Sequence, residues 1–332
     1  MDYILKFRAA YPTVILSAIC LLFSATAVHA QTPGEYPSRA VKIIVPFPAG
    51  GTLDNVSRLV AKGLSEKWGQ SVIIYNKPGG AAVIGTEAAA QSAPDGYTLL
   101  FMANGFVIVP MMMRKVPYDP LKDFVPISLI ARVNQVLVAP PTFKADDLKQ
   151  LTAAAKKAPN TISFASFGLG TSSHLAMELF KKEAGIELIH VPYKGVAPAL
   201  QDTLGGQVDM FFTNFPEVIG YLQSGKLKAL AVADTKRLPQ LPNIPTFAEQ
   251  GYKDFNVYSW YGAVAPAGTP DAIVQKISST IAQVVKELDQ TKQVKDWGVV
   301  MVGSTPAELG RHMRSEQDRY AEVIRASGAT LD

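Results

Sequence analysis

Cysteine and histidine are scarce in this sequence, which has one cysteine, Cys20, and four histidines among 332 residues. A lone cysteine cannot close a disulfide within the chain, and scattered histidines without cysteines argue against a metal site. We therefore expect no metal, no cofactor and a fold that depends on its hydrophobic core. Apolar residues make up 48% of the chain, and the length is enough for two domains of ordinary size.

An excess of charge of either sign is also missing. The formal net charge is +4, and charged residues make up 18% of the chain. No run of lysines and arginines suits a nucleic-acid surface, and no apolar run after residue 30 is long enough to span a membrane. The sequence therefore predicts a soluble monomer that binds no nucleic acid.

The first 30 residues have the layout of a secretory signal peptide. Lys6 and Arg8 precede an apolar stretch, residues 9–27, and Val28 and Ala30 stand at the −3 and −1 positions of a cleavage site. The stretch is also near the length of a membrane span, so an uncleaved anchor is the alternative. We expect a signal peptide over residues 1–30, cleavage after Ala30 and export to the periplasm.

Strand-like and helix-like segments alternate along most of the chain, which is typical of parallel sheets covered by helices. Residues 41–45 have the pattern of a strand, and residues 53–68 then repeat apolar side chains at spacings of three and four, as in an amphipathic helix. A second series of strands and helices begins near Leu137, includes a helix predicted over residues 145–157, and ends near residue 233. The C-terminal part from Asp271 onward is predicted to be mostly helical.

Two irregular apolar segments, residues 124–141 and 245–268, interrupt this alternation. We interpret each as a crossing between domains. The first domain would then be discontinuous, consisting of residues 31–132 and 253–332, and residues 133–252 would form the second domain. Each domain is predicted to be an α/β unit with a mainly parallel sheet flanked by helices.

Two glycines stand between the first strand and its helix, in the stretch "VPFPAGGTLD". At the carboxyl end of a parallel strand, the next helix presents free backbone N–H groups, and small anions bind there. Gly50 and Gly51 would let a ligand approach the backbone, and Thr52 could cap the helix and donate its hydroxyl. The alternative is that the glycines only make a tight turn.

The stretch "FASFGLGTSSHLAMELF" repeats this arrangement in the second proposed domain. A strand ends at Ser166, Gly168 and Gly170 follow, and hydroxyl residues open the next helix. Two such loops facing each other across a cleft would hold a small molecule with carboxylates. Neither loop has the Gly-Lys-Ser/Thr of a P-loop or the glycine spacing of a dinucleotide site.

At "GTLDNVSR" and "GLGTSSHLAMELF" the chain resembles the Bug family, the extracytoplasmic substrate-binding proteins of tripartite tricarboxylate transporters. Segments such as "NKPGGAAVIGTEAAA", "PDGYTLLF" and "WYGAVAPAGTP" extend the resemblance over nearly the whole chain after the signal peptide. The resemblance implies a two-domain clamp like that of periplasmic binding proteins, with the ligand cleft between the domains. It also implies the capture of a small organic carboxylate for integral-membrane permease subunits.

In such a clamp, residues 46–54 would hold one carboxylate, partly through ordered waters, and residues 165–174 would hold the other end of the ligand. The predicted ligand-binding residues are Phe47, Ala49, Gly50, Gly51, Thr52, Asp54, Ser166, Gly168, Gly170, Thr171, Ser172, His174, Tyr193 and Asn214. No catalytic residue is expected.

Two other functions remain open. His174 lies beside Ser172 and Ser173, so an exported hydrolase-like enzyme that uses this histidine and a serine is one alternative. A triad also needs an acidic partner for the histidine, and no carboxylate is recognisable at this helix start. The second alternative is that the loaded protein acts as a co-receptor for a sensor kinase.

Three charged residues near the loops have two interpretations each. Asp54 and Arg58 are spaced for an ion pair on the first helix, which would either orient the loop or be an ordinary surface pair. Lys194 follows a strand end and would either face an anionic ligand or be solvated. The sequence does not distinguish these interpretations.

The ligand class is predicted from one departure from the family pattern. Family members often have an aspartate where this chain has Thr213, and a cleft carboxylate there could pair with an amino group. With no cleft carboxylate left except that of Asp54, a buried ammonium would be unpaired and costly. We therefore expect an organic acid without an amino group.

Overall fold

The computed structural model describes residues 36–253, 255–327 and 330. Pro37–Asp332 forms one compact unit. The predicted signal peptide, residues 1–30, lies outside the described residues. None of the helices within the described ranges is long and apolar enough to cross a membrane.

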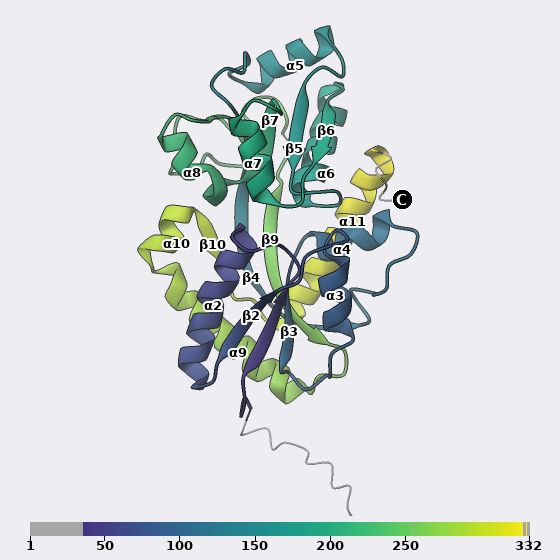
Figure 1. The fold of residues 1–332 in the computed structure, drawn as a ribbon, viewed down its shortest axis with the longest axis vertical. Helices are drawn as coiled ribbons and strands as arrows, with labels where there is room; N and C mark the ends of the chain where they lie inside the picture. The colour runs from purple at the N-terminus through teal and green to yellow at the C-terminus, as the bar shows by residue number, and fades with distance from the viewer. Residues whose placement is uncertain (1–35, 254, 328–329, 331–332) are drawn as a thin grey trace, which may run out of the picture. The chain divides into compact units, whose positions relative to one another are not determined.

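Within the same ranges, ten strands form one mixed sheet in the order β2-β1-β3-β9-β4-β7-β5-β6, with β10 and β8 also paired to β4 (Figure 1). The strands are β1 (Val41–Val45), β2 (Val72–Asn76), β3 (Thr98–Ala103), β4 (Phe124–Ala139), β5 (Ser163–Ser166), β6 (Ile189–Pro192), β7 (Met210–Asn214), β8 (Lys228–Val232), β9 (Tyr258–Pro266) and β10 (Val299–Met301).

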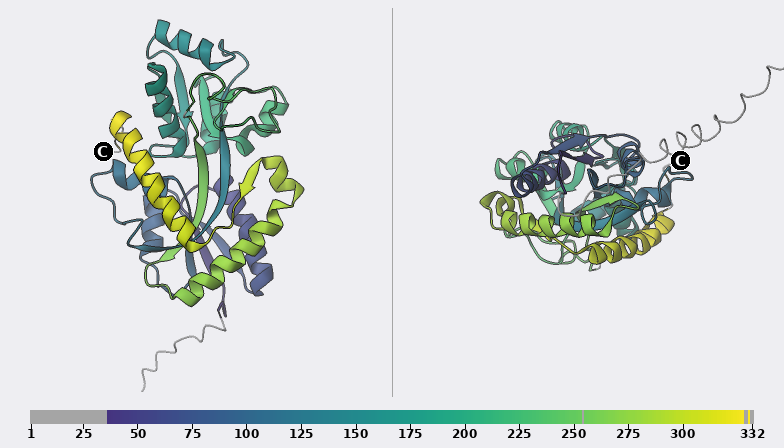
Figure 2. Two further views of the ribbon diagram at one scale, coloured as in Figure 1. Left: turned by 180° about the vertical axis from the view of Figure 1, so that it is seen from behind. Right: turned by 90° about the horizontal axis from the view of Figure 1, so that it is seen from below.

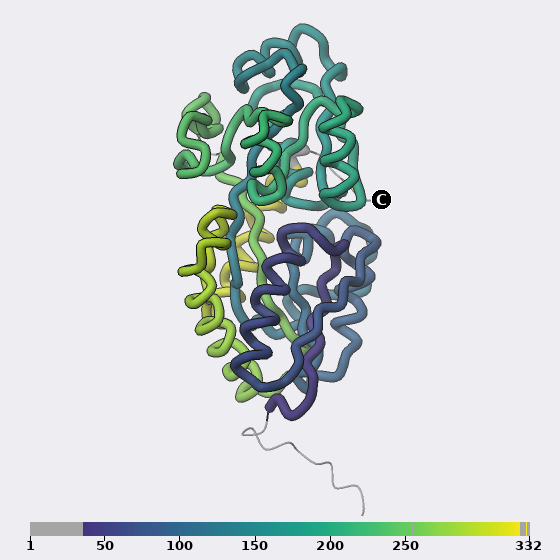
Figure 3. The backbone as a smooth tube through the Cα atoms, turned by 60° about the vertical axis from the view of Figure 1, so that its left-hand side comes forward, coloured from purple at the N-terminus to yellow at the C-terminus, as the bar shows by residue number. Residues whose placement is uncertain are grey.

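Strand β4 is shared by two halves of this sheet. Up to Asn134 it pairs with β9 and β10, and from Gln135 onward it pairs with β7 and β8. We define lobe 1 as the half with β1, β2, β3, β9 and β10, and lobe 2 as the half with β5, β6, β7 and β8, each with the helices packed on it. Figure 3 shows the chain passing between the lobes at β4 and β9.

Strand direction differs between the outer strands and the centre. In lobe 1, β1 runs parallel to β2 and β3, and in lobe 2, β5 runs parallel to β6 and β7. The central strands β4 and β9 are antiparallel to each other and to their other neighbours. The two segments that interrupt the alternation in the sequence therefore contain the antiparallel strands. The boundaries of two separate domains stay a prediction.

Helices cover both lobes. They are α2 (Thr52–Trp68), α3 (Val83–Ala90), α4 (Gly105–Met112), α5 (Leu148–Lys157), α6 (Ser172–Ala184), α7 (Val196–Leu204), α8 (Phe215–Gln223), α9 (Asp271–Asp289), α10 (Lys292–Trp297) and α11 (Pro306–Ser327). Helices α9 and α11 pack on β4 and lie across one face of the sheet (Figure 2).

Helix α2 illustrates how the sequence determines the fold near the cleft. Its apolar residues Leu53, Val56, Val60 and Leu64 are buried, as their spacing predicts. The helix ends at Gly69, whose φ of 64° is the left-handed conformation that glycine adopts easily. Because only the loop of residues 46–51 separates β1 from α2, the free N–H groups of α2 lie near the carboxyl end of that strand.

Candidate functional site

A cavity of about 320 Å³ has walls from both lobes. Its lining comes mainly from the segments at and after the carboxyl ends of β1, β3, β5, β6 and β7, where ligands commonly bind in α/β proteins. Most of the surface that lines the cavity is apolar. The lining residues are 47–54, 103–105, Phe167, Thr171, Ser172, 194–198, Leu200, Asn214, Glu217, Tyr221, Ser259 and Tyr261.

The Asp54 side chain holds the loop between β1 and α2. Its Oδ2 accepts hydrogen bonds from the N–H of Gly50 at 3.0 Å and from Arg58 Nε at 2.9 Å, and its Oδ1 accepts from Asn76 Nδ2 at 2.9 Å. Burial alone would raise the pKa of this carboxyl, but these hydrogen bonds hold its pKa below the usual value. Since Asp54 is only 2% exposed, the contacts favour an orienting role over an ordinary surface ion pair.

The two glycines of this loop differ in conformation. Gly50 has a φ of 91°, which favours glycine, whereas Gly51 has a φ of −76°. A Cβ at Gly51 would have Val196 Cγ2, at 3.8 Å, as its nearest neighbour. Among the described residues, no acceptor bonds to the N–H of Gly51. Gly50 therefore serves the turn, and Gly51 leaves an N–H group accessible at the cavity wall.

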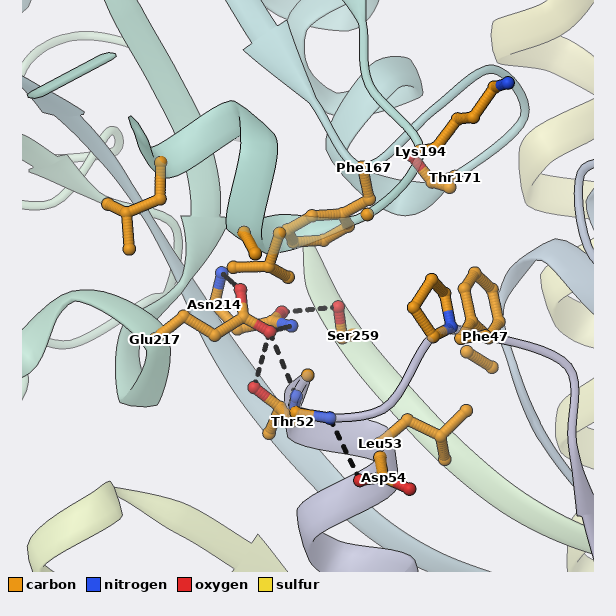
Figure 4. A pocket seen from close by; sticks show the side chains of 18 of the residues that line it. Phe47, Thr52, Leu53, Asp54, Phe167, Thr171, Lys194, Asn214, Glu217 and Ser259 are labelled. Carbon is orange, nitrogen blue, oxygen red and sulfur yellow. Dashed lines mark hydrogen bonds between the residues drawn. The ribbon is translucent and has the colours of Figure 1, made fainter. Parts of the chain in front are cut away.

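Glu217 brings a carboxylate into the cavity (Figure 4). Its Oε1 accepts hydrogen bonds from the N–H of Thr52 at 3.2 Å, from Thr52 Oγ1 at 2.6 Å and from Asn214 Nδ2 at 3.0 Å. Its Oε2 accepts from Thr213 Oγ1 at 2.6 Å and from the N–H of Asn214 at 3.3 Å. Five donors, two of them from lobe 1, therefore surround this one carboxylate.

Neutral polar groups complete the floor of the cavity next to Glu217. Asn214 Oδ1 accepts a hydrogen bond from Ser259 Oγ at 2.7 Å, and Asn214 Nδ2 also donates to the Tyr261 hydroxyl at 3.2 Å. Burial and then the charge of Glu217 raise the pKa of Tyr261 well above its ordinary value, so this hydroxyl stays neutral. Ser172 Oγ lies 3.1 Å from Ser259 Oγ, which links the start of α6 to β9.

The predicted second loop uses its polar groups largely within the protein. Ser166 Oγ lies 2.7 Å from His190 Nε2, and the N–H of Gly170 donates to His174 Nδ1 at 3.3 Å. The rings of His174 and His190 stack with their centres 4.2 Å apart, and Ser173 Oγ donates to the carbonyl of Phe212.

Burial of the His174 and His190 rings keeps both of them neutral. It lowers the pKa of His174 to about 4. Burial, followed by the neighbouring His174 and Lys181, lowers the pKa of His190 to about 3. Within the described part of the chain, no group of three His, Cys, Asp or Glu side chains could hold a metal ion.

A groove of about 730 Å³ adjoins the cavity. The two spaces share Phe47, Pro48, Phe167, Thr171, Lys194 and Gly195 in their lining. In Figure 4 the Lys194 side chain extends away from Thr52 and Glu217, and the residue is exposed. This placement favours the solvated interpretation of Lys194.

The structure brings most of the predicted site residues to these two spaces. Those that line the cavity are Phe47, Ala49, Gly50, Gly51, Thr52, Asp54, Thr171, Ser172 and Asn214, and those that line only the groove are Gly168 and Tyr193. Ser166, Gly170 and His174 line neither space and are hydrogen-bonded beneath the loop. Direct contact between a ligand and these residues stays a prediction.

Glu217 was not among the predicted residues, and it contradicts one premise of the prediction of the ligand class. That prediction assumed that no carboxylate except Asp54 faces the cleft, which is wrong because Glu217 lines the cavity. Thr213 itself is fully buried and does not line the cavity. The identity of residue 213 therefore says nothing about the ligand, and an organic acid without an amino group stays a prediction.

Comparisons with known proteins agree over nearly the whole chain. The model of the family TctC, described as "Tripartite tricarboxylate transporter family receptor", matches residues 56–329. Protein BugT of Bordetella pertussis is 36% identical over 322 residues, which cover 96% of this chain and 99% of BugT.

Two solved structures are similar as well. The structure of R. palustris Rpa4515 with adipate is 35% identical with a TM-score of 0.85, covering 89% of this chain and 100% of that one. The structure of the periplasmic binding protein BugD is 35% identical with a TM-score of 0.83, covering 89% of this chain and 99% of that one. These likenesses confirm the predicted two-domain periplasmic-binding-protein fold class.

Proposed function

The chain belongs to the TctC family of tripartite tricarboxylate transporter receptors, and from this membership we propose that it captures a small organic carboxylate in the cavity between its two lobes. The observation that supports this most directly is the free N–H of Gly51, at the start of α2 and at the wall of the cavity. The N-terminus of α2 adds a partial positive charge that favours an anion there.

The apolar lining provides the second part of the proposal. A carboxylate group would bind at residues 49–51, and the carbon skeleton of the acid would pack against side chains such as Phe47 and Phe167. The adjoining groove gives room for longer or aromatic acids. The adipate found in the relative from R. palustris supports the same class of ligand for this chain.

We propose that the protein binds its ligand and catalyses no reaction. The hydroxyl oxygen of Ser172 is hydrogen-bonded to Gln135 and Ser259 and not to His174. Ser166 does contact His190, but Ser166 is fully buried. No observation therefore favours an exported hydrolase that uses His174 and a serine.

Export and delivery belong to the same proposal. The signal peptide over residues 1–30 would be cleaved after Ala30, and the loaded protein would pass its acid to integral-membrane permease subunits. Mass spectrometry of the protein purified from periplasm should give a chain that begins at Gln31. A membrane-bound protein that retains residues 1–30 would contradict this part.

Ligand screening tests the proposal as a whole. Thermal-shift measurements with adipate, malate, hexanoate, benzoate and glutamate should show stabilisation by at least one acid, since a ligand that binds only the folded protein raises its stability. Glucose and cadaverine are the matched neutral and cationic controls, and they should have no effect. Stabilisation by a control alone, with no response to any acid, would contradict the proposed function.

A further inference from the structure

We infer that Glu217 is a positioning residue for ligand capture: its carboxylate ties the start of α2 in lobe 1 to the start of α8 in lobe 2 and thereby slows the escape of a bound acid. This inference rests on the proposed function. Glu217 lines the cavity and acts through the two loops that surround the ligand.

The hydrogen bonds of Glu217 fall into two groups. Those from Thr213 and Asn214 lie within lobe 2, and a glutamate at the third position of a helix commonly makes such a bond to the residue that precedes the helix. The bonds from the N–H and the hydroxyl of Thr52 come from lobe 1. They add nothing to the cap of α8, so capping alone does not explain them.

Two helix N-termini converge on this one carboxylate. Thr52 is the first residue of α2, and Glu217 lies in the first turn of α8. Each helix has a partial positive charge at its N-terminus, so an anion placed between them is attracted by both. Hydrogen bonds to an ionised acceptor are also stronger than neutral ones.

The coordination of Glu217 leaves it no free acceptor sites. An ionised carboxylate has about four lone-pair positions, and five hydrogen bonds already occupy them. A ligand carboxylate that displaced Glu217 from Thr52 would leave the half-buried Glu217 carboxylate with fewer hydrogen-bond donors, which is costly. The acid therefore binds beside Glu217, at the N–H of Gly51, while the bonds to Thr52 persist.

We expect ligand escape to need separation of the two lobes at the cavity, and such a separation would break the bonds between Glu217 and Thr52. Removing them should therefore act on dissociation more than on association. Stopped-flow fluorescence with adipate and malate as probes measures both rates. We expect Glu217→Gln to raise the dissociation rate at least about tenfold, or about 1.4 kcal/mol, and to change the association rate less than about threefold.

Two further variants separate positioning from capping. Thr52→Val removes one bond across the cavity and leaves the α8 cap intact, so it should also raise the dissociation rate, and the double variant should add little to Glu217→Gln alone. Glu308→Gln is the matched control, because Glu308 lies in the first turn of α11, accepts from the N–H and hydroxyl of Thr305 at 2.8 Å each, and does not line the cavity. Its dissociation rate should equal that of the wild type.

The outcomes are distinct. Tighter binding by Glu217→Gln would show that Glu217 competes with the ligand for Thr52, and it would overturn the inference. A lower melting temperature with unchanged dissociation rates would assign Glu217 to capping alone and overturn it as well. A wild-type protein that binds no acid would refute the proposed function, and this inference with it.

Discussion

Gly51 is the residue whose substitution separates ligand binding from folding most clearly. Its φ of −76° suits any residue, and a Cβ there would meet only Val196 Cγ2 at 3.8 Å. The conformation that requires glycine in this loop belongs to Gly50, whose φ is 91°. Variants with a larger side chain at residue 51 should therefore fold normally, and the added side chain should fill the space where a carboxylate would approach.

We predict that Gly51→Val weakens acid binding at least about tenfold, or about 1.4 kcal/mol, and shifts the melting temperature by less than about 2 °C. Gly51→Ala should give a smaller loss, because it adds one methyl group. Titration calorimetry with the best acid from the thermal-shift screen measures the affinity. If the valine variant folds and binds with wild-type affinity, the carboxylate does not bind at this N–H.

Asp54 should matter for stability through its buried hydrogen bonds. We predict that Asp54→Ala lowers the free energy of unfolding by about 1–3 kcal/mol, since the N–H of Gly50 and the amide of Asn76 lose their acceptor. Lys62→Ala is the control, because its side chain is 78% exposed and its distance to Glu66 is 4.0 Å. If urea unfolding gave equal losses of stability for both variants, the contact between Asp54 and Arg58 would be an ordinary surface ion pair.

Single residues also show what the sequence could and could not predict of the site. The glycines and hydroxyls at the start of α2 were predictable because a strand, two glycines and a helix form a local pattern. Glu217 was not, because an Asn followed three residues later by Glu has the ordinary pattern of a helix cap. Only the folded chain brings Thr52, which is 165 residues away in sequence, to the same carboxylate.

At the scale of elements, regular patterns predicted segments well and their ends less well. The predicted helix from residue 145 begins at Leu148, because the Asp147 side chain accepts from the N–H of Gln150 and caps it there. Helix α4 was not predicted, since it is apolar on all sides and contains Pro110. A short buried helix of this kind has no period that distinguishes it from a strand.

The contact between α6 and β6 should make stability depend on pH. His174 on α6 and His190 on β6 are neutral when stacked, with pKa values of about 4 and about 3, below the usual value of about 6.5. The unfolded chain therefore binds more protons in this range, and stability is complete above pH 6.5 and falls as the pH drops toward 4. We expect a loss of up to about 2 kcal/mol per histidine between pH 7 and pH 5.

Urea unfolding at pH 7 and pH 5 measures this loss. A His174→Gln, His190→Gln double variant should lose much less stability between the two pH values than the wild type. His312→Gln is the comparison, because burial lowers the pKa of His312 to about 4 as well. This variant should remove only the part of the stability loss that comes from protonation of His312. Equal losses in the wild type and the double variant would mean that the stacked rings do not titrate as proposed.

For the whole molecule, the strands β4 and β9 connect the two lobes. Both run antiparallel at the centre of the sheet, and β4 changes its pairing partners between Asn134 and Gln135. Its pairing register with β8 shifts between Leu137 and Val138. The βα alternation predicted the parallel outer strands, but the antiparallel pairs join segments far apart in the sequence, and no local pattern fixes them. We expect the sheet to bend at this change of partners when the lobes move.

We predict that the lobes close on a bound acid, because residues 49–51 and Phe47 from lobe 1 and Phe167 from lobe 2 line one cavity, and each lobe would hold only part of the ligand. Small-angle X-ray scattering with a saturating acid should give a smaller radius of gyration than the protein alone. Gly51→Val at the same acid concentration is the control, and it should keep the larger value because it binds weakly. An unchanged scattering curve at saturation proven by calorimetry would contradict closure, and the site would then act as a preformed cavity whose hydrogen bonds between Glu217 and Thr52 persist with or without ligand.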